Sequence, residues 1–287
     1  MRYGPVDMFS GGNMPANYAA NDPEAYEQMM GRWSRKLAPQ FAAFAKLHNP
    51  ATILDVGCGT GNLAVALASR FQDARVTGVD QSQAFIASAR SQDPENRRLI
   101  FDEGEATALP FADHSFDATL SLLVVNFIPD PERAVREMVR VTKPGGIVAA
   151  CVWDYPGGFT CVRIFADTAA VLDPSGEEYR AKQFSARFTG ADELANEWTR
   201  LGLCNVEQTT LMIRMEFESF EDYWKPWLGG QGTVGAYVTS LREEKRRRLE
   251  HHLRLAYLGG RPDGRRSFTA AAWAVRGTKS TECARAD

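Results

Sequence analysis

The sequence predicts an α/β fold with a mostly parallel sheet and helices on both of its faces. Three observations lead to this prediction. Short apolar segments alternate with segments of helical period between residues 51 and 153, the first apolar segment ends in a run of glycines, and 44% of the residues are hydrophobic. Parallel strands need crossover connections, and the helices that provide them cover both faces of the sheet.

The N-terminal half contains five of the expected strands. Asp22-Pro23 is typical of a helix start, after a loop rich in Gly, Asn and Pro. Trp33 falls on the apolar stripe of that helix, and Pro39 is expected to begin a second helical segment. The expected strands cover residues 52–56, 76–79, 98–101, 116–120 and 147–152, and the expected helices cover residues 63–71, 84–90 and 130–139.

The C-terminal half interrupts this alternation. Residues 154–190 show no clear period, and aromatic side chains are scattered through them. A helix over 191–201, a strand over 210–217, helices over 219–227 and 239–258 and a strand over 267–275 are expected. These patterns divide the chain into a helical cover (1–50), a core (51–153, 191–217 and 263–277), helical and aromatic lid insertions (154–190 and 218–262) and a tail (278–287).

Composition narrows the classes of partner. The chain has 287 residues and a formal net charge of -3, and such a near-neutral surface argues against nucleic acid or an anionic membrane as a partner. The start of the chain lacks the apolar segment of a signal peptide. Five cysteines at irregular spacing fit neither a disulfide framework nor a zinc site. We expect a cytoplasmic monomer or homodimer that holds no metal.

The sharpest motif lies where the first strand meets the next helix. It contains Asp55, Gly57, Gly59 and Gly61, and Asp80 ends the following strand. Glycines allow a tight turn and a close approach of a ligand, and an acidic residue after the second strand can accept the hydroxyls of a ribose. Asn62 stands where a dinucleotide fingerprint needs its third glycine. The motif therefore favours a nucleoside cofactor without phosphates over a nicotinamide dinucleotide.

Further motifs follow in order along residues 51–153. They lie at residues 53–61, 79–80, 104–106 with 109–111, 115–117 and 140–146, and residues 30–35 add a cover segment upstream. This series resembles the class I S-adenosylmethionine-dependent methyltransferases, most of all the small-molecule branch related to quinone-ring methyltransferases. The resemblance implies S-adenosyl-L-methionine as cofactor, S-adenosyl-L-homocysteine as product, and a Rossmann-like seven-stranded sheet of order 3-2-1-4-5-7-6 whose seventh strand is antiparallel.

The resemblance also implies roles for single residues. The three glycines would pass beneath the methionine part and the ribose, Asp80 would hold the ribose hydroxyls, and Gln81 would lie beside the adenine. Glu105, where the family usually has Asp, would accept the adenine amino group beside the backbone of Ala106. Leu122 or Leu123 would face the sulfonium. The remaining members of the implied cofactor set are Trp33 and Asp55.

The acceptor side is marked by aromatic residues. Those expected to bind it are Trp153, Tyr155, Phe159, Tyr223 and Trp227. Such side chains suit a small planar or lipophilic acceptor of O-, N- or C-methylation, and their packing within a lid core is the competing interpretation. No catalytic residue can be assigned, because His114, the one weak candidate for a base, falls in a turn before a strand. A nicotinamide-dependent oxidoreductase and a non-catalytic cofactor-binding sensor or partner subunit are the alternatives.

Overall fold

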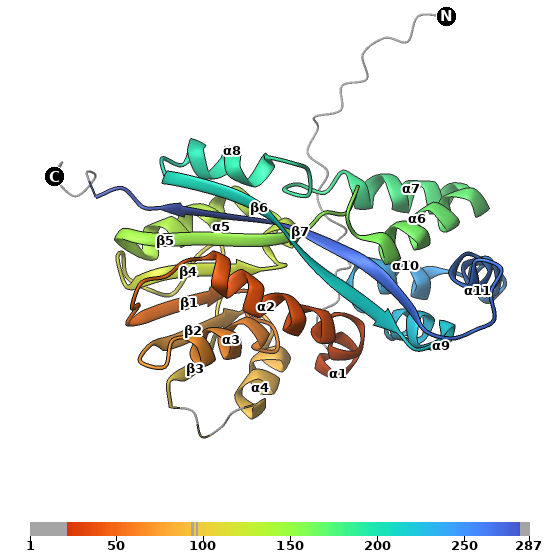
Figure 1. The fold of residues 1–287 in the computed structure, drawn as a ribbon, viewed down its shortest axis with the longest axis horizontal. Coiled ribbons are helices and arrows are strands. Elements are labelled where there is room, and N and C mark those ends of the chain that lie inside the picture. Colours follow the sequence, from red (N-terminus) through yellow and green to blue (C-terminus); the bar gives the residue numbers. More distant parts are fainter. Residues whose placement is uncertain (1–21, 93–94, 96, 282–287) are drawn as a thin grey trace, which may run out of the picture.

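The seven-stranded sheet has the expected order, β3-β2-β1-β4-β5-β7-β6, in a computed structural model that describes residues 22–92, 95 and 97–281. β7 pairs antiparallel with both β5 and β6, whereas the other pairs are parallel (Figure 1). The sheet prediction is therefore confirmed. The strands are β1 (Thr52–Val56), β2 (Arg75–Asp80), β3 (Leu99–Glu103), β4 (Phe116–Leu122), β5 (Thr142–Trp153), β6 (Cys204–Phe217) and β7 (Arg266–Thr278).

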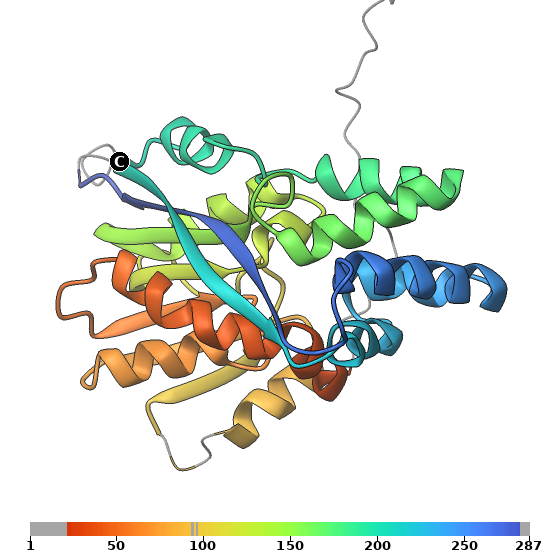
Figure 2. The same ribbon diagram turned by 45° about the vertical axis from the view of Figure 1, so that its right-hand side comes forward.

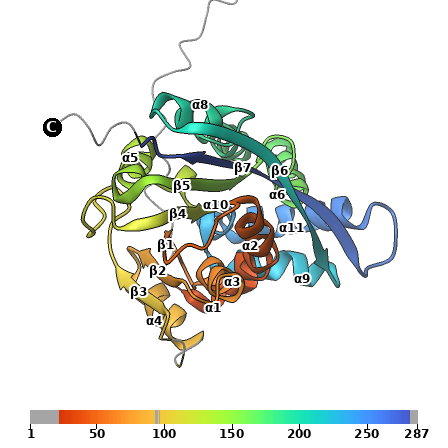
Figure 3. The same cartoon turned by 60° about the vertical axis from the view of Figure 1, so that its left-hand side comes forward.

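Helices cover both faces of the sheet. One face carries α2 (Arg32–Phe44), α3 (Asn62–Arg70) and α4 (Gln83–Gln92), and their apolar side chains share one core with β1 and β4. The other face carries α5 (Pro131–Val141) and α8 (Glu193–Arg200), which Figure 3 shows away from α2 and α3. Its core contains Trp198, whose indole N–H donates to the carbonyl of Val148 at 2.8 Å.

The N-terminal helices form part of the core as well as a cover. Asp22 caps α1 (Pro23–Tyr26), and a π-helical turn over Glu27–Gly31 leads directly into α2. Pro39 lies inside α2, so the prediction of a second helical segment at this residue was wrong. Leu37 and Phe41 on the same helix are fully buried. A continuous apolar face holds α2 on the sheet despite the missing amide hydrogen of the proline.

The two insertions fold into a helical lid at one end of the sheet. The first contributes α6 (Thr160–Leu172) and α7 (Pro174–Phe184), and the second contributes α9 (Phe220–Trp224), a 3-10 turn (Lys225–Gly229), α10 (Gly232–Ser240) and α11 (Glu243–Leu258). β6 and β7 extend beyond their neighbours to this lid (Figure 2). None of the described helices has both the length and the apolar character needed to cross a membrane.

The lid is helical, as expected, but the sequence did not locate all of its helices. Residues 154–190, which show no clear period, contain two helices, and the prediction of one helix over 239–258 was wrong, because it is divided at Leu241 into α10 and α11. The helical start of α10 was hidden by its glycines. Gly235 is needed there because a Cβ would approach the backbone of Gly230 to 2.7 Å, which no side chain tolerates.

Candidate active site

A sharp turn at the end of β1 forms the floor of the site. The amides of Gly57 and Cys58 both donate to the carbonyl of Val79, at 2.7 and 3.0 Å. Gly57 has a φ of 71°, and a Cβ here would collide with the side chain of Val124. The position therefore requires glycine, and the backbone lies open at the carboxyl ends of β1 and β2.

Asp80 ties this turn to the next strand. One of its carboxylate oxygens accepts from the amide of Gly59 at 2.9 Å, and the other accepts from the amide of Ser82, also at 2.9 Å. Burial raises the pKa of Asp80, and these two amides act in the opposite direction. Asp80 thus fixes the turn against the second strand, and its carboxylate forms part of the pocket wall.

A pocket of about 440 Å³ opens above the turn, within the size range of small-molecule sites. Its charged lining residues are Asp80, Glu105, Asp130 and one cation, Arg133. Apolar side chains from several elements complete the wall: Tyr26, Val79, Phe85, Leu123, Val124, Phe127 and Ile128. The lining is acidic on balance and offers a flat ligand apolar surfaces.

A second carboxylate lies at the start of α3. Glu27, in the π-helical turn, accepts from the Thr60 hydroxyl and from the Asn62 side-chain amide, the latter at 3.2 Å. Its other oxygen pairs with Arg35 at 2.6 Å. Gly31 makes room for this arrangement, since a Cβ at that position would collide with the Glu27 carboxylate. The helix N-terminus that binds pyrophosphate in dinucleotide folds is here occupied by a negative side chain.

Asp55 lies buried at the end of β1, only 1% exposed. Neither of its carboxylate oxygens has a hydrogen-bond partner among the described residues. Burial raises its pKa to about 8, the nearby amide of Ala64 lowers it, and Asp80 raises it further. A desolvated acid of this kind gains most from a cationic ligand.

A narrow aromatic slot of about 40 Å³ adjoins the pocket. Tyr26, Leu123 and Phe127 line both spaces. Leu123 has a φ of 63°, which is uncommon for a side chain of this size, and its amide donates to the carbonyl of Cys151 at 2.7 Å. Backbone strain of this kind gathers at ligand sites, and here it directs one residue between two cavities.

The structure brings most of the expected residues together. The pocket is lined by Gly57, Gly59, Asp80, Gln81, Glu105, Ala106 and Leu123. The slot is lined by Trp153, Tyr155, Phe159 and Trp227. Of the cofactor residues named from sequence, those that line neither space are Trp33, Asp55, Gly61 and Leu122. Trp33 instead packs against Phe217, with ring centroids 5.3 Å apart.

Tyr223 and His114 lie away from both cavities. Tyr223 is buried in the lid and donates its hydroxyl to the carbonyl of Cys161 at 2.9 Å, which fits the interpretation of a lid-core residue. His114 lies in the exposed turn before β4, where its Nδ1 is 3.2 Å from the carbonyl of Thr142 and 3.0 Å from the Lys279 ammonium. This is the amino edge of the sheet, whereas the pocket lies at the carboxyl edge.

Several lining residues were missed at the level of sequence. Tyr26 and Phe85 meet across the pocket with ring centroids 5.1 Å apart, and Phe127 separates the pocket from the slot. Aromatic residues just after the ends of the second and fourth strands were the available signal for Phe85 and Phe127. For Glu27, the only signal was the glycine four residues later on a helix, at position 31.

Comparison with known proteins decides the family. A family model described as "Methyltransferase domain" matches residues 54–150. The demethylmenaquinone methyltransferase of Bacillus licheniformis is 32% identical over 167 residues, which is 55% of this chain and 72% of that protein. The chain belongs to the class I S-adenosylmethionine-dependent methyltransferases. It is therefore an enzyme that transfers the methyl group of S-adenosylmethionine to a small molecule.

Two further proteins are similar to this methyltransferase over part of their own length. The chloroplastic 2-methyl-6-phytyl-1,4-hydroquinone methyltransferase 1 of Oryza sativa subsp. japonica is 34% identical over 150 residues, 52% of this chain and 44% of that protein. The second is a solved structure of Haemonchus contortus phosphoethanolamine N-methyltransferase 2 in complex with phosphomonomethylethanolamine and S-adenosylhomocysteine. The two structures match over 93% of this chain and 58% of the Haemonchus chain, with a TM-score of 0.57. At 18% identity, that likeness shows the fold alone.

Asp80→Asn tests the carboxylate that faces the pocket. The variant removes the negative charge and turns one amide group toward a backbone N–H. Because hydrogen bonds to a charged group contribute about 1.5–3 kcal/mol, we expect S-adenosylhomocysteine affinity to fall about tenfold to a hundredfold. Calorimetric titration measures the loss. Glu103→Gln is the matched control, because Glu103 pairs in register with Asp80 on β3, is exposed and does not line the pocket. Equal affinities in wild type and Asp80→Asn would remove Asp80 from the binding site.

His114→Asn tests the weak candidate for a base. Asn tolerates the left-handed backbone of this residue, whose φ is 60°. Since the side chain lies at the far edge of the sheet, turnover measured as S-adenosylhomocysteine release should stay within about twofold of wild type. A positioned base contributes about 10²–10⁴-fold, so a drop of that size with normal cofactor affinity would make His114 catalytic after all.

Proposed function

We propose that this methyltransferase acts on a planar, lipophilic acceptor of the quinone-ring type, whose reacting edge enters the aromatic slot. The observation that carries the proposal is the shared wall formed by Tyr26, Leu123 and Phe127, because it places the slot directly against the cofactor pocket. Trp153 and Phe159 stack in that slot with ring centroids 4.8 Å apart. The Bacillus relative is named for demethylmenaquinone and the rice relative for a phytyl hydroquinone, and both names support the same class of acceptor.

The chain's own residues fit the cofactor in three respects. The buried Asp55 oxygens lack a partner among the described residues and suit the ammonium group of the methionine part. Asp80 offers a carboxylate to the ribose hydroxyls, and the apolar wall that includes Phe85 suits the flat adenine. Glu105, exposed at the pocket mouth, and the backbone of Ala106 would meet the adenine edge. When bound, S-adenosylmethionine supplies a methyl group on a positively charged sulfur.

The slot contributes enclosure rather than acid–base chemistry. Its lining contains no carboxylate, imidazole or ammonium group among the described residues; the tyrosines Tyr26 and Tyr155 are its polar side chains besides Thr233 and the Trp N–H groups. The acceptor atom must therefore arrive as a lone-pair or anionic nucleophile, as the hydroxyl or activated carbon of a phenolic ring can. Apolar walls exclude water and align the two reactants, which is what an in-line displacement needs.

The charge around the glycine turn argues against the oxidoreductase alternative. A pyrophosphate would meet Glu27 at the start of α3 and Asp80 on the pocket wall, with Arg133 as the one cation of the described lining. Like charges at such a site cost binding free energy. A cofactor that carries positive charge and no phosphate is favoured instead. Action in the cytoplasm as a monomer or homodimer completes the proposal. The net charge of -3 supports the further expectation that neither nucleic acid nor an anionic membrane is a partner.

Calorimetric titration with S-adenosylhomocysteine, NAD and NADP tests the proposed function. We expect S-adenosylhomocysteine to bind in the micromolar range or tighter and neither dinucleotide to bind measurably. The enzyme is then incubated with methyl-labelled cofactor and either demethylmenaquinone or a soluble hydroquinone, and we expect the label to appear in the ring product. Dinucleotide binding without S-adenosylhomocysteine binding would overturn the proposal, and cofactor binding without transfer to any ring acceptor would favour a sensor or partner subunit.

Proton linkage tests the role of Asp55. With a pKa of about 8 the acid is largely protonated at pH 7, and pairing with a ligand ammonium lowers that pKa. Binding of S-adenosylhomocysteine at pH 7 should therefore release up to one proton, and the release should vanish above about pH 9. Titrations in buffers of different ionisation enthalpy measure it. Asp55→Asn should bind without release; a wild type that releases no proton at pH 7 would contradict the pairing.

A further inference from the structure

Two buried hydrogen-bond donors on the wall of the aromatic slot lack an acceptor. Trp153 ends β5 and is 2% exposed, and Trp227 lies in the 3-10 turn of the second insertion and is 4% exposed. Both line the slot, and neither indole N–H has a hydrogen-bond partner among the described residues. A buried indole N–H ordinarily finds an acceptor, as that of Trp198 does in the carbonyl of Val148. Two unsatisfied donors around one small cavity indicate a ligand that supplies the acceptor.

Packing fixes both indole rings. Trp153 stacks on Phe159, with ring centroids 4.8 Å apart. Trp227 contacts Phe165 and Tyr223, each at 6.3 Å between ring centroids. Rings held in this way lose little conformational freedom when a ligand binds. The two donors are therefore set in place in advance, which is how hydrogen-bond donors stabilise negative charge in an active site.

The slot has room for an oxygen and the ring carbon that carries it but not for a whole ring, because its volume is about 40 Å³. Both indole nitrogens are closed to solvent in this structure, so the slot must widen as the oxygen enters. Met29 and Met30 also line the slot, and methionine side chains repack at low cost. The oxygen-bearing edge of the acceptor then lies beside the wall that the slot shares with the cofactor pocket.

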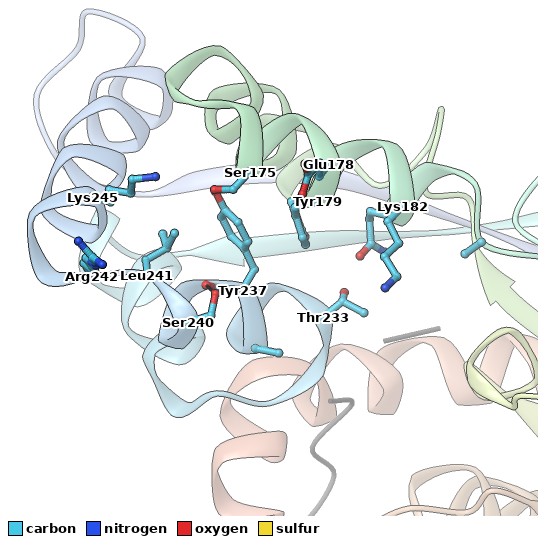
Figure 4. Close-up of a pocket in the computed structure, with 13 residues that line it drawn as sticks. Ser175, Glu178, Tyr179, Lys182, Thr233, Tyr237, Ser240, Leu241, Arg242 and Lys245 are labelled. Atoms are coloured by element: carbon cyan, nitrogen blue, oxygen red, sulfur yellow. Dashed lines mark hydrogen bonds between the residues drawn. The ribbon is translucent and has the colours of Figure 1, made fainter. Parts of the chain in front are cut away.

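A larger cleft in the lid does not offer the same position. It has a volume of about 640 Å³ and lies between α7 and α10 (Figure 4). Its lysines, Lys182 and Lys245, are exposed and lie at opposite ends of the cleft in Figure 4. The cleft shares no lining residue with the cofactor pocket, whereas the slot shares three. An oxygen bound in the cleft would not face the methyl donor, so the reacting oxygen belongs in the slot.

We propose that the indole N–H groups of Trp153 and Trp227 bind the oxygen of a phenolic acceptor in its ionised form. This inference rests on the proposed function and adds the groups that select the acceptor. The phenol releases its proton to solvent as it binds, and its oxygen accepts a hydrogen bond from each indole. Hydrogen bonds to an anionic oxygen are about twice as strong as those to a neutral one, so the two donors favour the phenolate without a base.

The bound phenolate is the nucleophile that an in-line displacement needs. An electron pair of its oxygen, or of the ring carbon next to that oxygen, forms the bond to the methyl group while the bond from carbon to sulfur breaks. A ring carbon that receives the methyl group afterwards loses its hydrogen to solvent as a proton. Trp153 and Trp227 thus determine specificity for an acceptor with an acidic hydroxyl on the ring.

An isosteric substitution tests the two donors. 3-Benzothienylalanine carries sulfur in place of the indole N–H, so its incorporation in place of Trp153 or Trp227 removes the hydrogen bond and keeps the packing. Pentafluorophenol, which is ionised at pH 7, and pentafluorobenzene, which lacks the oxygen, are titrated by fluorine NMR into enzyme saturated with S-adenosylhomocysteine. We expect each substitution to weaken phenolate binding at least about tenfold and to leave pentafluorobenzene within about twofold. The same substitution at Trp198 is the control, because its N–H is bonded in the core on the other face of the sheet.

The pKa of a bound phenol gives a second measurement. 4-Nitrophenol is followed by the absorbance of its phenolate, and donors that favour the phenolate should lower its pKa by about one in the wild-type complex. Substitution of Trp153 or Trp227 should return that pKa toward the value in solution. Phenolate selectivity that is unchanged by both substitutions, or lowered equally by the substitution at Trp198, would overturn the inference and leave the proposed function standing, as would a wild-type complex that binds no phenolate. Wild-type enzyme that fails to bind S-adenosylhomocysteine would instead overturn the proposed function.

Discussion

The contact between Glu27 and the start of α3 holds the site together. Its carboxylate joins the cover helices to the glycine turn through Thr60 and Asn62, while Arg35 neutralises the other oxygen. Asn62 also donates to the Ser34 hydroxyl at 3.0 Å, so the connection has several bonds rather than one. Networks of buried hydrogen bonds gain strength in a low dielectric and lose it when one member is missing.

The position of the pocket walls follows from that contact. With Glu27 fixed, the preceding residue Tyr26 lies against Phe85 of α4, and the following Met29 and Met30 line the slot. The Glu27 carboxylate lies against Gly31 in the π-helical turn, where no side chain stands in its way. A short segment of altered helix is a frequent feature of functional sites, and here it lets one segment serve both cavities.

The aromatic slot is formed by segments that are far apart in the sequence. β6 and β7 extend past the sheet and carry the second insertion to the first (Figure 2). The cover helices meet both insertions at the slot, and Leu123 enters from β4 on a strained backbone.

The sequence by itself determined the sheet, the cofactor end of the site and the family. Strand–helix alternation and the glycine turn are local patterns, and they predicted a parallel sheet with Gly57 and Asp80 at one end of it. The resemblance to the methyltransferase family added the order of the strands and the place of Glu105. Only the tertiary structure decided the bounds of the helices within residues 154–190, the separation of α10 from α11, and the places of Tyr223 and Trp33 in packed cores. Glycines and prolines in those segments obscure helical periodicity, and contacts with remote elements outweigh local propensity there. The Glu27 contact and the aromatic slot form between segments distant in the chain, and no local pattern encodes such contacts.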